Sequence, residues 1–256
     1  MATLKEFKKD KLSVYVFDSC KAMGDKAGYD AATAICKILE TKECANVMFA
    51  AAPSQNETLA ALLADTRVDW TRVNAFHMDE YVNIDPSHKA SFRNFLKKAI
   101  FDVKPFRNVF LINGNAESME EEEKRYSELL KANPLDVCLL GIGENGHIAF
   151  NDPSVADFND PKSVKIVELE EVCRMQQVHD GCFDSLDEVP KYAYTVTIPA
   201  LLDCGCHICT VPAPTKANAV KSMLEWDINE KCPCTALRNV DNAGLYLDQD
   251  SSSLIM

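Results

Sequence analysis

The sequence predicts an α/β fold, a Rossmann-like three-layer sandwich with a mostly parallel central sheet. Apolar runs of strand length alternate with helical segments along the 256 residues, and the connections between them are short. The run at 135–140 is apolar at every position except Asp136, which is typical of a parallel strand that is covered on both faces. Right-handed crossovers between such strands place helices on both sides of the sheet.

The individual elements follow from the apolar periodicity, in chain order. A β-rich run at 11–17 and an alanine-rich helix at 18–40 open the chain. Strands are then expected at 45–52, 73–78, 109–112 and 135–140, and helices after Pro53, at 91–100 and at 116–132. The last part is expected to hold strands at 164–169, 194–198, 206–211 and 244–247, and a helix at 216–225. We see no linker and no internal repeat, so one domain over residues 1–256 is predicted.

Composition limits the classes of function. Lys and Arg number 27 against 39 Asp and Glu, and the resulting formal net charge of −12 gives no support to binding of nucleic acid or of an anionic membrane surface. No stretch reaches the roughly 18 apolar residues of a membrane-spanning helix. Residues 1–7 lack the apolar core of a signal peptide. We therefore expect a cytoplasmic protein without nucleic-acid or membrane partners.

The 11 cysteines are predicted to be free thiols, because a reducing compartment keeps thiols unpaired. Cys36 and Cys138 are expected in the core. A metal site is not predicted, since the paired C-x₂-C spacing of zinc sites is missing from the C-terminal group of Cys204, Cys206, Cys209, Cys232 and Cys234.

The most informative motif is Gly-Ile-Gly-Glu-Asn-Gly-His-Ile-Ala-Phe-Asn-Asp-Pro at 141–153, directly after the apolar run 135–140. Its glycines allow a ligand to approach the backbone closely, and open α/β sheets bind ligands beyond their strand ends. His147 can carry or release a proton near neutral pH, and Asp152 is close enough in sequence to orient the imidazole. The motif predicts a general acid/base site.

A second carboxylate is expected in the same crevice. Asp79 ends the strand predicted at 73–78, so its side chain would project beyond the sheet edge that carries the histidine motif. A carboxylate there could move a proton between two carbon atoms of a sugar. From the residues alone, a solvated turn formed by Asp79 and Glu80 is the simpler interpretation.

The motif at 141–153 resembles the signature of the glucosamine-6-phosphate deaminase (isomerase) family, which reads roughly Gly-Ile/Val-Gly-x-Asp-Gly-His-Ile-Ala-Phe-Asn-Glu-Pro. Residues 76–82, Phe-His-Met-Asp-Glu-Tyr-Val, resemble that family's Phe-Asn-Met-Asp-Glu-Tyr-Val. The spacing to residues 189–193, Val-Pro-Lys-Tyr-Ala, also matches, so the resemblance covers nearly the whole chain. Two departures occur beside the histidine: Asn145 replaces an Asp, and Asp152 replaces a Glu.

The resemblance implies an amino-sugar phosphate deaminase/isomerase that converts glucosamine 6-phosphate to fructose 6-phosphate and ammonia. His147 would open the pyranose ring, and Asp79 would transfer the proton. Asn145 and Asp152 would set the charge environment of the histidine and complete the catalytic group. The implied reaction requires no metal and no organic cofactor.

Substrate contacts are expected from a helix start and from cations, because backbone amides and flexible amines bind phosphate. Ser54 and Gln55 occupy the place of the family's Thr-Gly-Gly-Thr-Pro loop, and Lys216 matches the family's phosphate-binding lysine. Arg174 is a second candidate cation, although a surface salt bridge would explain it equally well. Glu80 and Gly143 complete the expected substrate-binding set. Lys162 and Lys165 match the family's allosteric phosphate site only loosely, so no allosteric site is predicted.

Three alternatives remain open at this point. Relatives that act on galactosamine 6-phosphate also resemble this chain in carrying Asn-Gly-His. A 6-phosphogluconolactonase-like hydrolase is a second alternative, but that family's histidine motif continues Thr-Ala-Ser-Leu-Phe-Pro, unlike residues 148–153. A third is a non-catalytic sugar-phosphate sensor. Family members are monomers, trimers or hexamers, and we expect a homo-oligomer.

Overall fold

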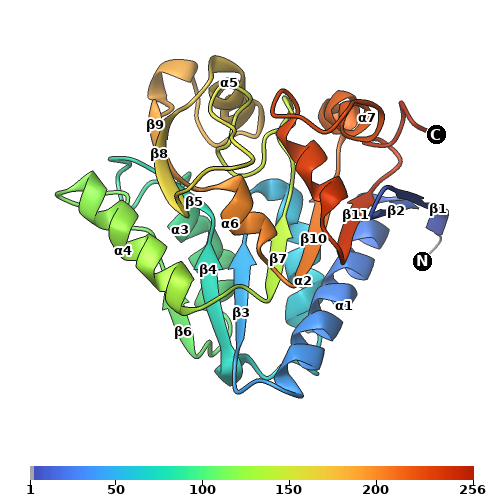
Figure 1. The fold of residues 1–256 in the computed structure, drawn as a ribbon, viewed down its shortest axis with the longest axis horizontal. Helices are drawn as coiled ribbons and strands as arrows, with labels where there is room; N and C mark the ends of the chain where they lie inside the picture. Colours follow the sequence, from blue (N-terminus) through green and yellow to red (C-terminus); the bar gives the residue numbers. More distant parts are fainter. Residues whose placement is uncertain (1–2) are drawn as a thin grey trace.

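The computed structural model describes residues 3–256 and places an eight-stranded sheet between two layers of helices (Figure 1). In spatial order its strands are β1 (Thr3–Lys9), β2 (Leu12–Phe17), β11 (Ala243–Leu247), β10 (Cys206–Val211), β7 (Val137–Leu140), β3 (Ala45–Phe49), β4 (Val73–His77) and β6 (Asn108–Phe110). Every neighbouring pair is parallel except β1 and β2. The predicted three-layer α/β architecture with a mostly parallel sheet is confirmed.

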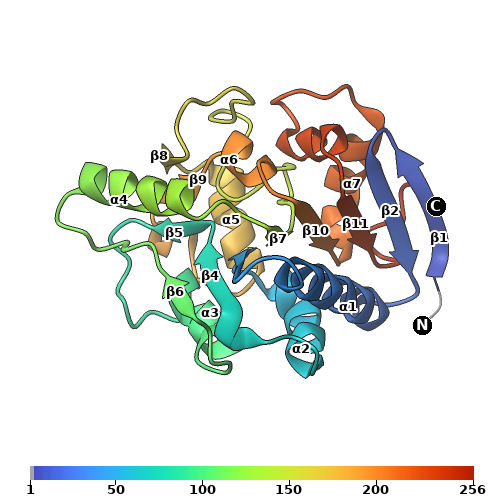
Figure 2. The same ribbon diagram turned by 60° about the horizontal axis from the view of Figure 1, so that its bottom comes forward.

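The helices lie on both faces of this sheet (Figure 2). One face is covered by α1 (Cys20–Leu39), α2 (Asn56–Ala64) and α3 (Phe92–Leu96), which continues as a π-helical turn at Lys97–Phe101. The other face is covered by α4 (Met119–Ala132), α6 (Ile198–Leu202) and α7 (Ala217–Glu225). Alternate residues of a strand serve the two layers: Val47 and Phe49 pack with α1, whereas Met48 packs in the opposite core. No helix within residues 3–256 has both the length and the apolarity to cross a membrane.

The strand order reverses between β3 and β7. From β3 the chain adds β4 and β6 in one direction, and from β7 it adds β10 and β11 in the other. Loops that leave the ends of β3 and β7 therefore diverge, and they open a crevice between them. The loop after β3 begins with Ala50, and the loop after β7 begins with Gly141.

A second, three-stranded antiparallel sheet lies beyond the carboxyl end of β4 (Figure 1). It consists of β5 (Asp79–Tyr81), β9 (Tyr192–Val196) and β8 (Val164–Glu168), with β9 in the middle. Met78 joins it to the main sheet, because its carbonyl accepts a hydrogen bond from Val196 N at 2.8 Å. The chain thus leaves the main sheet at the residue before Asp79.

Several details differ from the sequence-based expectations, including the unpredicted strand β5 and helix α6. Strand β1 was not expected, because most of its residues are polar and exposed; Asp10, at φ 54°, forms the turn into β2. Strand β6 ends before Ile112, whose N–H donates to His77 Nε2 at 2.8 Å. Helix α5 (Glu171–His179) was also not expected, and it lies near the second sheet (Figure 1).

Candidate active site

A cleft of about 460 Å³ lies at the carboxyl ends of the central strands. The loops after β3, β7 and β10 line it, together with the junction of β4 and β5. Six of the predicted site residues line this cleft: Ser54, Gln55, Asp79, Gly143, His147 and Lys216. The tertiary structure therefore brings together residues from four separate parts of the chain.

The loop after β7 is folded tightly around its histidine. Gly143 N donates to His147 O at 2.9 Å, and Gly146 N donates to Gly143 O at 3.0 Å. A Cβ atom on Gly143 would lie 2.1 Å from His147 Cε1, and Gly146 has φ 83°. Both positions require glycine, because a side chain would overlap the imidazole at the first and be strained at the second.

Asn145 and Asp152 hold the Nδ1 edge of the imidazole. Nδ1 lies 2.8 Å from Asn145 Oδ1 and 3.1 Å from Asp152 Oδ1. The Asn145 amide group donates to Asp152 Oδ1 at 2.9 Å, and its oxygen accepts from His147 N at 3.1 Å. Two acceptors at Nδ1 favour a proton on that nitrogen, which leaves the Nε2 lone pair available to the cleft. Asn145 and Asp152 do not line the cleft, so we describe them as positioning residues that act through His147.

Burial opposes ionisation of Asp152, but hydrogen bonds from its neighbours have the larger combined effect. Donors from His147, Asn145 and Glu170 N together lower the pKa of the Asp152 carboxyl. Glu170 was not predicted from the sequence. Its carboxylate accepts from Ser154 N at 2.9 Å and from the Asn145 amide at 3.4 Å. Glu170 thereby supplies an acidic group next to Asn145, where the sequence motif has lost one.

Asp79 is a buried carboxylate at the start of β5. It pairs with Thr195 on β9, and its side chain is 7% exposed. The pKa of Asp79 is raised well above its ordinary value. Burial is the main cause, and the charge of Glu80 is the second. A poorly solvated carboxylate is a stronger base than an exposed one, which suits proton abstraction from carbon.

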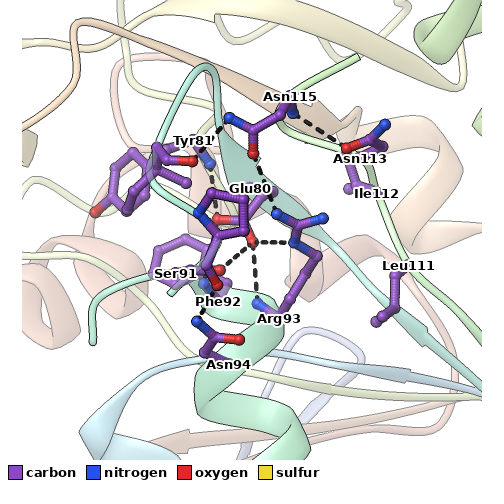
Figure 3. Close-up of polar contacts among 12 residues, drawn as sticks. Glu80, Tyr81, Ser91, Phe92, Arg93, Asn94, Leu111, Ile112, Asn113 and Asn115 are labelled. Carbon is purple, nitrogen blue, oxygen red and sulfur yellow. Dashed lines mark hydrogen bonds and ion pairs between the residues drawn. The ribbon is translucent and has the colours of Figure 1, made fainter. Parts of the chain in front are cut away.

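Glu80 faces away from the cleft, and this corrects the prediction that it contacts substrate. Its carboxylate accepts hydrogen bonds from Tyr81 N, Ser91 Oγ, Phe92 N and Arg93 N at 2.9 to 3.1 Å (Figure 3). Arg93 Nε lies 3.4 Å from Glu80 Oε2, and the Glu80 side chain is fully buried. All of its partners lie at the start of α3 or on β5 itself. Glu80 therefore ties β5 to α3 and holds the strand that carries Asp79.

Glu80→Ala is expected to destabilise the fold by about 3–5 kcal/mol, because it leaves the Arg93 charge and several backbone donors without an acceptor. The free energy of unfolding from urea titration measures this loss. Glu80→Gln keeps one acceptor oxygen and should cost less. A loss below about 1 kcal/mol for Glu80→Ala, the net value of a single ordinary hydrogen bond, would contradict this role.

The phosphate end of the predicted site contains one free amine. Lys216 is 6% exposed, and its Nζ has no hydrogen-bond partner within residues 3–256. Burial lowers the pKa of Lys216, although the charges of Asp180 and Glu144 oppose that change. The preceding Ala213 has φ 82° and donates to Asp248 Oδ2 at 3.1 Å, which fixes the turn that leads to the lysine. An unpartnered, buried amine that lines a cleft is suited to bind an anion.

Ser54 and Gln55 are adjacent in the chain but have different roles. Gln55 is 1% exposed, and its amide accepts from Thr210 Oγ1 at 3.1 Å and reaches Leu140 O at 3.4 Å. It therefore connects the loop after β3 to β7 and β10, as a structural link at the cleft floor. Ser54 is more exposed and accepts from the Gln55 amide at 3.3 Å, so its hydroxyl proton remains available to a ligand.

Arg174 is not in the cleft, which corrects the expectation of a second substrate cation. Its guanidinium donates to the carbonyls of Leu186 and Val189 at 2.6 to 3.2 Å. These bonds hold the segment after α5 against the helix. Arg174 thus bonds to backbone carbonyls and, within residues 3–256, does not form the surface salt bridge that was the other expectation.

Sequence reasoning missed the cleft residues that come from α5 and from the end of the chain. They are Gln176, Gln177, Asp180, Asp248 and Asp250. Asp248 directly follows β11, so the argument that placed Asp79 beyond a strand end could have found it. The α5 residues carried no such signal, because the helix itself was not recognised.

The sequence is similar to proteins of one known family. The model of the glucosamine-6-phosphate isomerases/6-phosphogluconolactonase family matches residues 18–245. A glucosamine-6-phosphate deaminase of Bacillus cereus strain B4264 is 36% identical over 218 residues, which cover 85% of this chain and 81% of that protein.

Solved structures give the same relationship. A monomeric glucosamine-6-phosphate deaminase, described as a missing link of the NagB superfamily, superposes with a TM-score of 0.85 at 27% identity and covers 94% of this chain and 99% of its own. A 6-phosphogluconolactonase from Shewanella baltica OS155 has a TM-score of 0.75 at 14% identity, with 96% and 99% covered, and shares the fold.

Proposed function

Because the chain belongs to the glucosamine-6-phosphate isomerase/6-phosphogluconolactonase family, we propose that it converts glucosamine 6-phosphate and water to fructose 6-phosphate and ammonia. One observation carries this proposal: a buried carboxylate, an oriented imidazole and an unpartnered amine line a single cleft. These groups suffice for ring opening, proton transfer and phosphate binding.

Ring opening is assigned to His147. Its Nε2 accepts the proton of the anomeric hydroxyl and returns it to the ring oxygen, which breaks the bond between C1 and that oxygen. Asn145 and Asp152, both within 3.1 Å of Nδ1, keep the ring oriented and stabilise the imidazolium that forms between the two transfers.

Proton transfer is assigned to Asp79. It removes the proton from C2 of the open-chain sugar and delivers it to C1, which produces the imine of the ketose. Water then adds to the imine carbon, and ammonia leaves as fructose 6-phosphate forms. The reaction needs no electron acceptor, since the oxidation of C2 is balanced by the reduction of C1.

Phosphate binding is assigned to Lys216 and Ser54. Lys216→Met is expected to raise KM by roughly 10–100-fold, because a hydrogen bond to a charged group contributes about 1.5–3 kcal/mol. The same change should stabilise the fold near neutral pH, because the native state would no longer bury a charge that lacks a partner. Steady-state kinetics and thermal unfolding measure the two effects. Lys221→Met, at an exposed position of α7, is the matched control. An unchanged KM would contradict the assignment.

The pH dependence follows from Asp79. As a base it must be ionised, and burial raises its pKa well above the ordinary value. The kcat/KM of the free enzyme is therefore expected to fall on acidification at a pH clearly above about 3.9, the ordinary pKa of aspartate. A pH–rate profile tests this, and full activity down to pH 4 would contradict it.

The deciding assay measures release of ammonia and of ketose phosphate from purified protein. Glucosamine 6-phosphate and galactosamine 6-phosphate are compared as substrates, and 6-phosphogluconolactone hydrolysis is measured in parallel. Turnover of glucosamine 6-phosphate supports the proposal. Turnover of the galactosamine epimer alone, hydrolysis of the lactone alone, or binding without any turnover would each replace it with one of the alternatives.

A cytoplasmic location and a homo-oligomeric state stay predictions. The solved deaminase described above is monomeric. Light scattering of the purified chain would test the assembly.

A further inference from the structure

A buried cysteine that does not line the cleft lies beside His147 and Asp152. Cys173 is on α5, is 1% exposed, and was not part of any sequence-based assignment. One ligand atom each of Cys173, His147 and Asp152 lies within 4.8 Å of the others. Within residues 3–256 this is the only group of three or more His, Cys, Asp or Glu side chains that meets this distance criterion.

The three side chains come from separate parts of the chain. His147 follows β7, Asp152 follows five residues later, and Cys173 is supplied by α5. A hydrogen bond links the histidine loop to α5: the N–H of Glu170, just before α5 begins, donates to Asp152 Oδ2 at 3.1 Å. The spacing of the group is therefore set by the same contact that holds α5 near the histidine loop.

We propose that His147 Nδ1, Asp152 and Cys173 bind a thiophilic divalent cation, with Zn²⁺ as the best match, and that the bound ion inhibits the enzyme. Imidazole, carboxylate and thiolate are the ligand types of protein zinc sites. The two anionic groups balance the charge of the ion. Ligand atoms around tetrahedral zinc are roughly 3.3–3.8 Å apart, so side chains whose ligand atoms lie within 4.8 Å of one another need to approach by about 1.5 Å at most.

Three protein ligands leave the fourth position of the ion open. His147 lines the cleft, whereas Asp152 and Cys173 are buried and do not line it, so an ion on Nδ1 lies on the side of the imidazole away from the cleft. Water or Asn145 Oδ1, which lies 2.8 Å from Nδ1, could complete the coordination. The site thus shares His147 with the proposed catalytic centre.

Inhibition follows from the tautomer of the imidazole and rests on the proposed role of His147. Coordination takes the Nδ1 lone pair, so the ring proton must move to Nε2. The nitrogen that faces the cleft then no longer accepts a proton from the sugar hydroxyl. The thiol loses its proton to solvent, because only the thiolate binds the ion.

Direct binding tests the site without relying on turnover. Reduced protein is treated with EDTA, freed of the chelator, and titrated with Zn²⁺ against a chromophoric chelator. We expect one ion per chain and proton release on binding. Co²⁺ in place of Zn²⁺ should give a thiolate-to-metal charge-transfer absorption.

Cys173→Ser is expected to weaken Zn²⁺ binding by at least about 100-fold, since even indirect partners of a metal site are worth about 10–100-fold in affinity. The variant should also lose the Co²⁺ charge-transfer band. Cys182→Ser, a half-buried cysteine just beyond α5, is the matched control and should behave as the wild type. Activity with and without Zn²⁺ is measured on all three proteins, with EDTA added last to restore it.

The outcomes are separable. Equal Zn²⁺ affinity of wild type and Cys173→Ser, or no stoichiometric binding to the wild type, would overturn the site. Tight binding that depends on Cys173 but leaves deamination unaffected would overturn the inhibition. If the protein shows no deaminase activity at all, the binding and the Co²⁺ spectrum still decide the metal site.

Discussion

Asp79→Asn is expected to lower kcat for glucosamine 6-phosphate by about 10²–10⁴-fold, because the amide cannot accept the proton from C2. KM should change far less, since phosphate binding depends on Lys216 and Ser54. Steady-state kinetics give the split between the two constants. With ammonium present to re-form the ketose imine, exchange of the C1 proton of fructose 6-phosphate with deuterated water reports the proton transfer in the reverse direction, and it should disappear in the variant.

The same substitution should raise stability. A carboxyl whose pKa is raised on folding contributes stability that is present below its unfolded pKa and is lost as the pH rises through its folded pKa. At neutral pH, Asp79 therefore destabilises the native state when ionised, and a neutral amide removes this cost. Thermal unfolding of Asp79→Asn should occur at a higher temperature than that of the wild type near pH 7. Asp250→Asn, which removes an exposed carboxylate at the cleft, is the control for a general charge effect.

Activity near the wild-type level in Asp79→Asn would contradict its assignment as the base. A large loss accompanied by a lower unfolding temperature would instead indicate that Asp79 supports the fold. The two measurements together therefore separate a catalytic from a structural role.

His147→Gln is expected to lower kcat by about 10²–10³-fold with the cyclic substrate, because ring opening then proceeds without a proton acceptor. The later steps depend on Asp79 and should persist. An acyclic alditol phosphate that carries the 2-amino group needs no ring opening, so the variant should bind it nearly as tightly as the wild type does. Kinetics with the sugar and inhibition by the alditol measure the two properties.

A parallel loss of alditol binding would contradict a role confined to ring opening. Glutamine is chosen because its amide can keep a hydrogen bond to Asp152 or Asn145. Circular dichroism and thermal unfolding should confirm that the His147→Gln substitution leaves the fold intact.

Much of the architecture could be predicted from local sequence. Alternating apolar runs predicted the parallel strands and the helices between them, because burial on both faces demands continuous apolar residues. The placement of Asp79 and His147 in one crevice followed from a single rule. Both residues lie just beyond strands of a parallel sheet, and the carboxyl ends of such strands meet at one edge.

The exceptions also have physical reasons. Strand β1 is polar and exposed, so it lacks the burial that makes a strand visible in sequence. The buried residues of helix α5 include the polar Gln176 and Gln177. An element that lines a polar cleft does not display a simple apolar stripe.

The sequence by itself determined the sheet and the glycine-rich loop, because these depend on local periodicity and on backbone freedom at particular glycines. The choice of Asp79 and His147 as the central groups rested also on the family resemblance. Only the tertiary structure decided which neighbouring side chains point into the cleft. Asp79 and Glu80 are adjacent, yet one lines the cleft and the other ties β5 to α3, since successive side chains of a strand point in opposite directions. The free amine of Lys216 and the grouping of Cys173 with His147 depend on contacts between distant segments, and no local pattern encodes them.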